Sequence, residues 1–465
     1  MTARRSTGWS TGRRGRRTAA GSRRAIAVGV TAVLTLGLLQ GPATAMLPSP
    51  SPGPADMTGV PLAAAAPPAA TPPASATGVA PANLRATLDA VHAAGMYGIF
   101  SSVRDGDRRW SGASGVADTA TGRPAAAGMR TRVGSITKTF VATAILQQVE
   151  RGRVVLDAPI GTYLPDLFPG QRGRQVTVRM LLNHTSGIGD YVVNAFPSLA
   201  DLSPADLDRE RFRKVRPEQL VAWGLAAPPT GDPGERWSYS NTNYVIAGLL
   251  LEKVTGTKAE EYITREVIRK AGLKHTYFPT GPYVHGAHPR MYESLYQHVN
   301  PPRDYSVFDM SWAWTAGALV STTDDLNRFY RTLLTGGLVN RLSLAQMQQT
   351  VPVKDPDGDV LMKYGLGIYS VNLPCGTFWG HDGAVFGAGT QALSSADGGR
   401  QVAFGFNLMK YQRLDADGAP LPDPIDSALG AHVIQALCGT QSPTGPAEPG
   451  PPLRPLPLRF ARTGP

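Results

Sequence analysis

One serine and one lysine are spaced so that they can act together in catalysis. Ser135 and Lys138 lie three residues apart in the stretch Ser-Ile-Thr-Lys, and residues with this spacing are neighbours on one face of a helix. A serine hydroxyl is a weak nucleophile until a neighbour takes its proton, and a desolvated lysine with a lowered pKa can do so. A serine at a helix start also has free backbone N–H groups beside it, which stabilise negative charge. The pair therefore predicts acyl transfer through a serine nucleophile.

The same spacing also fits a serine that caps a helix beside a solvent-exposed lysine, which is the commoner arrangement. Two observations favour the catalytic interpretation. This is the only Ser-x-x-Lys in the chain, and the chain has nine lysines against 37 arginines. Because arginine supplies charge but cannot serve as a base, a lysine at this position indicates proton transfer.

A second group, Tyr239-Ser240-Asn241, follows a turn-rich stretch and leads into an expected helix. The tyrosine can relay a proton, and the asparagine can hydrogen-bond a substrate amide. Alternatively, Asn241 caps the following helix.

A third group, His381-Asp382-Gly383, lies in a glycine-rich stretch and precedes Ala384. Glycine in a strand lets a ligand or another chain approach the backbone closely, and a strand edge can bind an acyl substrate as an extra strand. The alternative is a glycine-rich hairpin with a surface histidine.

The order of the three groups resembles the three-motif pattern of the serine β-lactamase and penicillin-binding DD-carboxypeptidase family. The resemblance covers about residues 84–438, and stretches 181–187, 233–241 and 315–322 are similar to the class C β-lactamase branch. Within it, Tyr-Ser-Asn and a histidine in the third motif look more like secreted D-alanyl-D-alanine carboxypeptidases.

The resemblance implies a role for each residue. Ser135 would attack the carbonyl with help from Lys138, and Tyr239 would pass a proton to the leaving group. Asn241 would hold the acyl side chain, and His381 would supply positive potential or a hydrogen bond to Tyr239. Gly383 would belong to the substrate-binding strand, and the N–H groups of Ser135 and Ala384 would form the oxyanion hole. No metal and no organic cofactor are implied.

One residue departs from the family pattern. The carboxypeptidases usually have threonine between the histidine and the glycine, whereas this chain has Asp382, whose charge would repel a substrate carboxylate. We expect an exported carboxypeptidase-like serine hydrolase that works through an acyl-enzyme. An esterase, a β-lactamase or a D-amino-acid amidase of the same fold is the alternative, and a non-catalytic wall-peptide binding protein is a second. No Gly-x-Ser-x-Gly elbow occurs within residues 82–439, which argues against an α/β-hydrolase.

The net charge of +11 would suggest a nucleic-acid partner if it were spread over the chain. However, residues 1–45 hold eight arginines and no acid, and removing them lowers the charge to +3. We therefore expect no nucleic acid, and a small-molecule or peptide acyl substrate, with a peptidoglycan stem peptide as one possibility.

The N-terminal residues predict export. Arginines precede an apolar run at 25–39 and the small-x-small site Ala43-Thr44-Ala45, which is typical of a signal peptide. The run is shorter than the roughly 20 residues of a membrane span, and an uncleaved anchor is the alternative. We expect a secreted protein with no stable membrane span once residues 1–45 are removed, a Pro/Ala-rich linker at 46–81, a catalytic domain at 82–439 and a Pro-rich tail at 440–465.

Apolar periodicity predicts strands at both ends of the catalytic domain and helices between them, which indicates an α+β fold. The resemblance implies an antiparallel sheet flanked by helices and a mainly helical subdomain. Expected helices span 83–93, 135–150, 244–254, 259–271, 323–334 and 425–437. Expected strands span 96–103, 109–116, 364–371, 389–394 and 401–407.

Cys375 and Cys438 are the only cysteines. In an oxidising compartment one disulfide is expected, with two buried thiols as the alternative. His285 and His288 lie in a Gly- and Pro-rich stretch, and we expect surface loop residues there, not zinc ligands.

Overall fold

The computed structural model describes residues 80–355 and 358–439. The expected export signal, most of the expected linker and the expected Pro-rich tail lie outside these residues. Among the residues described, no helix combines the length and the apolar character that crossing a membrane requires.

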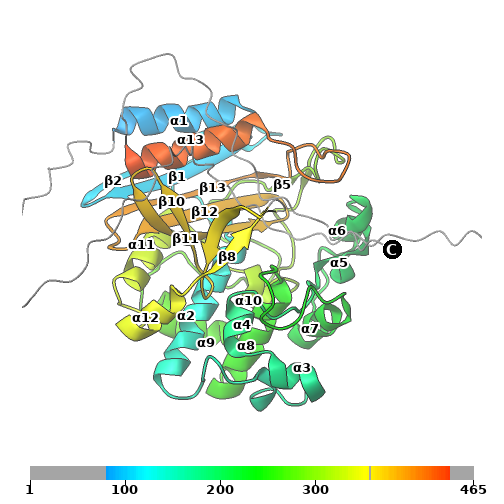
Figure 1. Cartoon of the computed structure of the whole chain (residues 1–465). Coiled ribbons are helices and arrows are strands. Elements are labelled where there is room, and N and C mark those ends of the chain that lie inside the picture. The colour runs from blue at the N-terminus through cyan, green and yellow to red at the C-terminus, as the bar shows by residue number, and fades with distance from the viewer. Residues whose placement is uncertain (1–79, 356–357, 440–465) are drawn as a thin grey trace, which may run out of the picture.

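A nine-stranded antiparallel sheet forms the centre of the fold, with the strand order β3-β2-β1-β13-β12-β11-β10-β9-β8 (Figure 1). A strand from the N-terminal part of the domain, β1, pairs with a strand from its C-terminal part, β13. The two ends of the domain therefore complete one sheet. The strands are β1 (Gly98–Asp105), β2 (Arg108–Asp118), β3 (Arg123–Pro124), β8 (Val351–Lys354), β9 (Val360–Tyr364), β10 (Tyr369–Leu373), β11 (Gly376–Val385), β12 (Ala388–Ser395) and β13 (Arg400–Phe406).

Helices cover both faces of this sheet. α1 (Pro81–Ala93) and α13 (Pro424–Cys438) pack together on one face, whereas α2 (Thr137–Glu150) and α11 (Thr323–Leu334) lie on the other (Figure 1). Below them lies a mainly helical region, which contains α3 (Gly170–Gln175), α4 (Val178–Leu182), α5 (Val192–Ala195), α6 (Ala205–Glu210), α7 (Pro217–Ala226), α8 (Asn241–Thr255), α9 (Ala259–Ile263), α10 (Trp314–Gly317) and α12 (Arg341–Met347). The expected α+β architecture is confirmed.

Two small sheets complete the fold. β4 (Thr131–Arg132) pairs with β7 (Val320–Ser321), directly before the expected nucleophile. The other joins β14 (Leu408–Met409), β5 (Tyr292–Glu293) and β6 (Arg303–Asp304).

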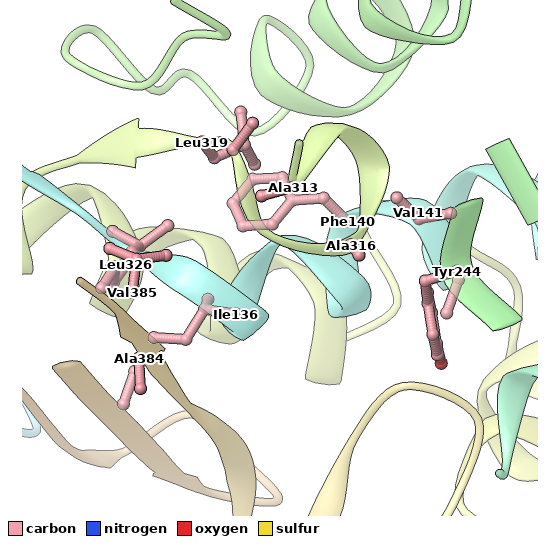
Figure 2. Packing of buried hydrophobic residues seen from close by; sticks show 14 of the residues in the cluster. Ile136, Phe140, Val141, Tyr244, Ala313, Ala316, Leu319, Leu326, Ala384 and Val385 are labelled. Carbon is pink, nitrogen blue, oxygen red and sulfur yellow. The ribbon is translucent and has the colours of Figure 1, made fainter. Parts of the chain in front are cut away.

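α2 is enclosed on all sides, because every residue from Thr137 to Gln148 is buried. Phe140 stacks on Phe329 of α11, with the ring centroids 3.7 Å apart. Figure 2 shows the apolar packing around the start of the helix, where Ile136 lies against the strand that carries Ala384. Since the core holds α2 on every side, its first turn has little freedom to move.

Three expected elements differ in detail. The strand expected at 364–371 is interrupted, because residues 365–368 form the turn between β9 and β10 and only its ends belong to those strands. Gly365 and Gly367 make this turn: a Cβ on Gly365 would lie 2.2 Å from the Met347 carbonyl oxygen, and Gly367 has φ +69°. The helix expected at 135–150 begins with a 3-10 turn at Gly134–Ile136, and the one expected at 259–271 passes from α9 into a π-helical turn at Thr264–Ile268.

A disulfide joins Cys375, in the turn between β10 and β11, to Cys438 at the end of α13. The Cα atoms are 5.4 Å apart, within the usual range for a bridge. The expected disulfide is present, and it ties the end of the final helix to the turn between β10 and β11.

Candidate active site

Ser135 lies in the 3-10 turn that precedes α2 and is almost fully buried. The turn approaches β11 very closely: Gly134 has φ +51°, and a Cβ there would lie 2.6 Å from the Ala384 nitrogen. Only glycine fits both the backbone conformation and this contact. Gly134 therefore allows the backbone of Ser135 to lie beside that of Ala384, where two N–H groups can serve one oxyanion.

Lys138 is fully buried one turn further along and contacts three oxygen atoms. Its Nζ lies 3.0 Å from Ser135 Oγ, 2.8 Å from Asn241 Oδ1 and 2.7 Å from the Ala316 carbonyl oxygen. Burial lowers the pKa of Lys138 to about 7, although the charges of Asp190 and Asp382 act to raise it. A neutral amine can donate its two N–H groups to Asn241 and Ala316, which leaves its lone pair facing the serine hydroxyl.

Tyr239 completes the contacts of the nucleophile. Its hydroxyl donates to Ser135 Oγ at 2.7 Å, and burial raises the pKa of Tyr239 well above its usual value. The tyrosine therefore keeps its proton at neutral pH and faces the serine as a donor. Lys138 from the first motif and Tyr239 from the second therefore meet at the Ser135 hydroxyl oxygen.

Asn241 is the first residue of α8, but its side chain does not cap the helix. Its amide nitrogen donates to Asp190 Oδ2 at 2.7 Å while its oxygen accepts from Lys138. Both ends of the side chain are held by the protein, so its contact with an acyl side chain stays a prediction. Asp190 was not identified from the sequence, because it is a single acid outside the three motifs.

The third motif lies in β11, on an edge that faces the nucleophile. β10 pairs with β11 only as far as Gly380, and beyond this point the 3-10 turn of Ser135 packs against β11. A Cβ on Gly383 would lie 1.9 Å from the Val133 carbonyl oxygen, so glycine is required there. The placement of Gly383 and Ala384 fits a substrate-binding edge, as the resemblance implied.

His381 is buried, and its Nε2 lies 2.8 Å from the Tyr364 hydroxyl. Burial lowers the pKa of His381 to about 3, so the imidazole is neutral at physiological pH. The expected positive potential is therefore absent, and the hydrogen bond goes to Tyr364 instead of Tyr239. The reason is that burial penalises the imidazolium and the positive charge of Lys138 disfavours it further, which outweighs the contacts of the ring with the Asp382 carbonyl oxygen and, at 3.6 Å, with Asp382 Oδ1.

Asp382 is 2% exposed, and its Oδ2 has no hydrogen-bond partner among the described residues. Burial raises the pKa of Asp382 to about 7, and the positive charge of Lys138 acts in the opposite direction. The middle residue of the third motif is therefore an acid, and it gives a substrate carboxylate no positive charge to bind.

The two loop histidines lie apart from this site. His285 is exposed, the ring of His288 contacts the carbonyl oxygen of Gly286, and the His288 carbonyl oxygen accepts from Arg123. Across residues 80–355 and 358–439, no group of three or more His, Cys, Asp or Glu side chains is arranged to hold a metal ion.

Comparison with known proteins identifies the class. The family model described as "Beta-lactamase" matches residues 81–421, which is most of the chain. The chain therefore belongs to the beta-lactamase family, and its relatives include penicillin-binding proteins.

Curated relatives carry different activities in their names. The chain is 28% identical over 225 residues to the putative penicillin-binding protein PbpX of Bacillus subtilis (strain 168), covering 46% of this chain and 49% of that one. It is 32% identical over 211 residues to esterase EstB of Burkholderia gladioli, covering 42% and 51%. The chain thus spans about half the length of these two relatives.

Solved structures give longer matches. A D-stereospecific amidohydrolase from Streptomyces sp. is 35% identical, with a TM-score of 0.68, and the match covers 78% of this chain and 99% of that one. The D-amino acid amidase from Ochrobactrum anthropi SV3 is 24% identical, with a TM-score of 0.63 and the same coverage, and this second likeness concerns the fold.

Proposed function

We propose that this protein hydrolyses amide bonds that follow D-amino acid residues, through an acyl-enzyme on Ser135, and that it prefers substrates without a free carboxylate at the leaving group. The observation that carries the chemistry is the contact of Ser135 Oγ with both Lys138 Nζ and the Tyr239 hydroxyl. The likeness to a D-stereospecific amidohydrolase, which covers 99% of that protein and 78% of this chain, supports the D-configuration.

In this proposal, neutral Lys138 takes the proton of the Ser135 hydroxyl as Oγ bonds to the carbonyl carbon. The N–H groups of Ser135 and Ala384 stabilise the oxyanion, and one such donor contributes about 3 kcal/mol to lowering the barrier. Tyr239 then gives its proton to the leaving nitrogen as the C–N bond breaks, and it regains a proton from the Lys138 ammonium. Water attacks the ester in a second cycle, which frees the acid and Ser135.

The substrate preference rests on charge. A carboxypeptidase must bind the terminal carboxylate of its substrate, and a cation or a hydroxyl in the third motif favours this. Here His381 is neutral and Asp382 is an acid, and neither attracts an anion. An amide or a capped peptide does not meet this repulsion.

A matched pair of substrates tests the preference. Acetyl-D-Ala-D-Ala and acetyl-D-Ala-D-alaninamide differ only in the terminal carboxylate. We expect the amide to be cleaved with a kcat/KM about 10-fold higher, as repulsion of order 1 kcal/mol predicts. Asp382→Thr should reduce this difference by raising the rate with the carboxylate substrate. The measurement is product formation by mass spectrometry.

Two controls and a second readout make the result decisive. Ser135→Ala should abolish both reactions, and the L,L amide should be cleaved far more slowly than the D,D amide. A faster reaction with the free carboxylate would contradict the proposal and support the D-alanyl-D-alanine carboxypeptidase instead. Incubation of the full chain with labelled penicillin gives a second readout, because a stable adduct on Ser135 would also favour the carboxypeptidase.

We also propose that the protein is exported. The arginine-rich start, the apolar run and the Ala43-Thr44-Ala45 site support this, as does a disulfide, which persists in oxidising compartments. N-terminal sequencing of the protein from the culture medium tests it, and an intact Met1 in the cytoplasmic fraction would contradict it.

A further inference from the structure

His184 follows α4, in a segment to which the proposed reaction assigns no role. It is fully buried, and its φ of +61° is unusual for a residue with a side chain. Backbone strain of this kind persists only where the surroundings hold the residue in place. The contacts of His184 are concentrated on the segment that carries Tyr239.

The main chain on either side of Tyr239 is bound to this single residue. The Ser238 N–H donates to the carbonyl oxygen of His184 at 2.8 Å, and the Ser240 N–H donates to His184 Nδ1 at 3.3 Å. The imidazole ring lies against the Tyr239 ring, with the centroids 4.3 Å apart. His184 therefore holds the backbone before Tyr239, the backbone after it and the tyrosine ring itself.

The orientation of the imidazole is set as well. Asn243 Nδ2 also faces His184 Nδ1, at 3.2 Å, and the Asn243 oxygen accepts from Ser186 Oγ at 2.6 Å. Because a backbone N–H can only donate, Nδ1 is an acceptor and the proton of the neutral ring resides on Nε2. The ring centroids of Tyr244 and Tyr364 lie 5.3 Å and 5.0 Å from the centroid of the imidazole.

The same geometry excludes a direct role in proton transfer. Nδ1 is already occupied by two donors, and Nε2 has no hydrogen-bond partner among the described side chains. Burial, reinforced by the charge of Lys138, also lowers the pKa of His184 well below its usual value. The ring cannot take a proton from Ser135 or Tyr239.

From these contacts we infer that His184 is a positioning residue for catalysis: it binds the backbone on both sides of Tyr239 and packs on its ring, so that the tyrosine hydroxyl faces Ser135 Oγ at 2.7 Å. This inference rests on the proposed function of Tyr239 as the proton donor to the leaving group. It adds a second requirement for proton delivery, namely that the tyrosine is held still.

The test compares two substrates with different needs for a proton. An anilide leaving group must be protonated, whereas p-nitrophenolate leaves without a proton. His184→Phe keeps an aromatic ring but lacks the Nδ1 acceptor. We expect it to lower kcat for D-phenylalanine anilide by about 100-fold, as a displacement of about 1 Å in a catalytic group predicts. For p-nitrophenyl acetate the loss should be at least 10-fold smaller, with KM nearly unchanged for both.

A double-mutant cycle separates positioning from general structural damage. In a Tyr239→Phe background, His184→Phe should cost less than a further 3-fold, because the hydroxyl it positions is absent. His184→Asn, which tolerates the positive φ and offers an oxygen acceptor, should recover part of the activity. An equal loss of kcat with and without Tyr239, or equal losses for anilide and ester, would overturn the inference.

His432 provides a matched control, since it is another fully buried histidine and bonds Thr87 and Ser101 on the opposite side of the sheet. His432→Phe should lower thermal stability without changing the ratio of anilide to ester rates. If wild-type protein cleaves p-nitrophenyl acetate but not the anilide, the proposed amidase function fails. The role of His184 is then decided by the same double-mutant cycle with D-phenylalanine methyl ester, because its alkoxide leaving group needs a proton and p-nitrophenolate does not.

Discussion

Two lysines are buried in the part of the chain that the structure describes, and their partners differ. Lys138, beside Ser135, has hydrogen bonds only to a hydroxyl, an amide oxygen and a backbone carbonyl. Lys410, at the end of β14, is 5% exposed and donates to Glu293 Oε2 at 3.0 Å. Glu293 is itself fully buried. One lysine faces neutral oxygen atoms, and the other faces a carboxylate.

The difference shows what turns a buried lysine into a base. Burial penalises the charged form of any lysine, and a contacting carboxylate offsets that penalty. Lys138 has no such contact, since Asp190 and Asp382 act on it only through space, and burial lowers its pKa to about 7. The chemistry of the partners, and not burial alone, distinguishes the catalytic lysine from the structural one.

The largest expected effect follows from replacing Lys138. Lys138→Ala and Lys138→Arg remove the neutral amine, so we expect the rate of acylation of Ser135 to fall by about 1000-fold. Release of p-nitrophenol from p-nitrophenyl acetate in the first turnover measures this rate. The control is Lys410→Met, which should acylate at the wild-type rate wherever it is folded. Full activity of Lys138→Arg would mean that a charged side chain suffices and that proton transfer to Lys138 is not required.

The second-largest expected effect is a loss of folding stability when Lys410 is replaced. Lys410→Met leaves Glu293 buried without a counter-ion, and we expect the free energy of unfolding to fall by about 3–5 kcal/mol. Glu293→Gln should cost a similar amount. The double variant should cost clearly less than the two single changes together, because neither charge is then left alone. Urea unfolding measures all three, and strictly additive losses would show that the pair does not act as a unit.

The smallest effect is a shift in pH dependence. Neutral Lys138 is the reactive form, so kcat/KM should rise with pH through about 7. It should then stay level, because burial keeps Tyr239 protonated. The charge of Asp382 raises the pKa of Lys138, so Asp382→Asn should move the rise to lower pH. Lys410→Met should leave it in place, and a move to higher pH in Asp382→Asn would contradict the assignment.

Much of the site was accessible from the sequence because its chemistry is local. Ser135 and Lys138 lie one turn apart, and Tyr239 and His381 stand in short motifs whose order along the chain is distinctive. The pairing of Cys375 with Cys438 followed from there being no other cysteine. Apolar periodicity also located most helices and the central strands.

The remaining features depend on tertiary contacts that no local pattern encodes. The Ala316 carbonyl, Asp190 and His184 reach the site from separate elements. His184 and Ala316 lie in the family-like stretches 181–187 and 315–322, but nothing in those stretches places them beside the nucleophile, and Asp190 lies outside them. His381 was expected to supply positive potential or a hydrogen bond to Tyr239. Only the three-dimensional structure shows that the ring is buried and neutral and that it contacts Tyr364. Glycine turns such as the one at Gly365 also resemble weak strands when only the apolar pattern is considered.

The proton state of Lys138 is the central claim, and it can be measured directly. The full chain has only nine lysines, so labelling their Cε carbons and following an NMR pH titration gives few signals, and the signal missing from Lys138→Arg identifies Lys138. We predict a midpoint near pH 7 for Lys138, well below the usual lysine value of about 10.4. A Lys138 signal that titrates together with the exposed lysines would contradict the account, because the amine would then be charged when Ser135 has to lose its proton.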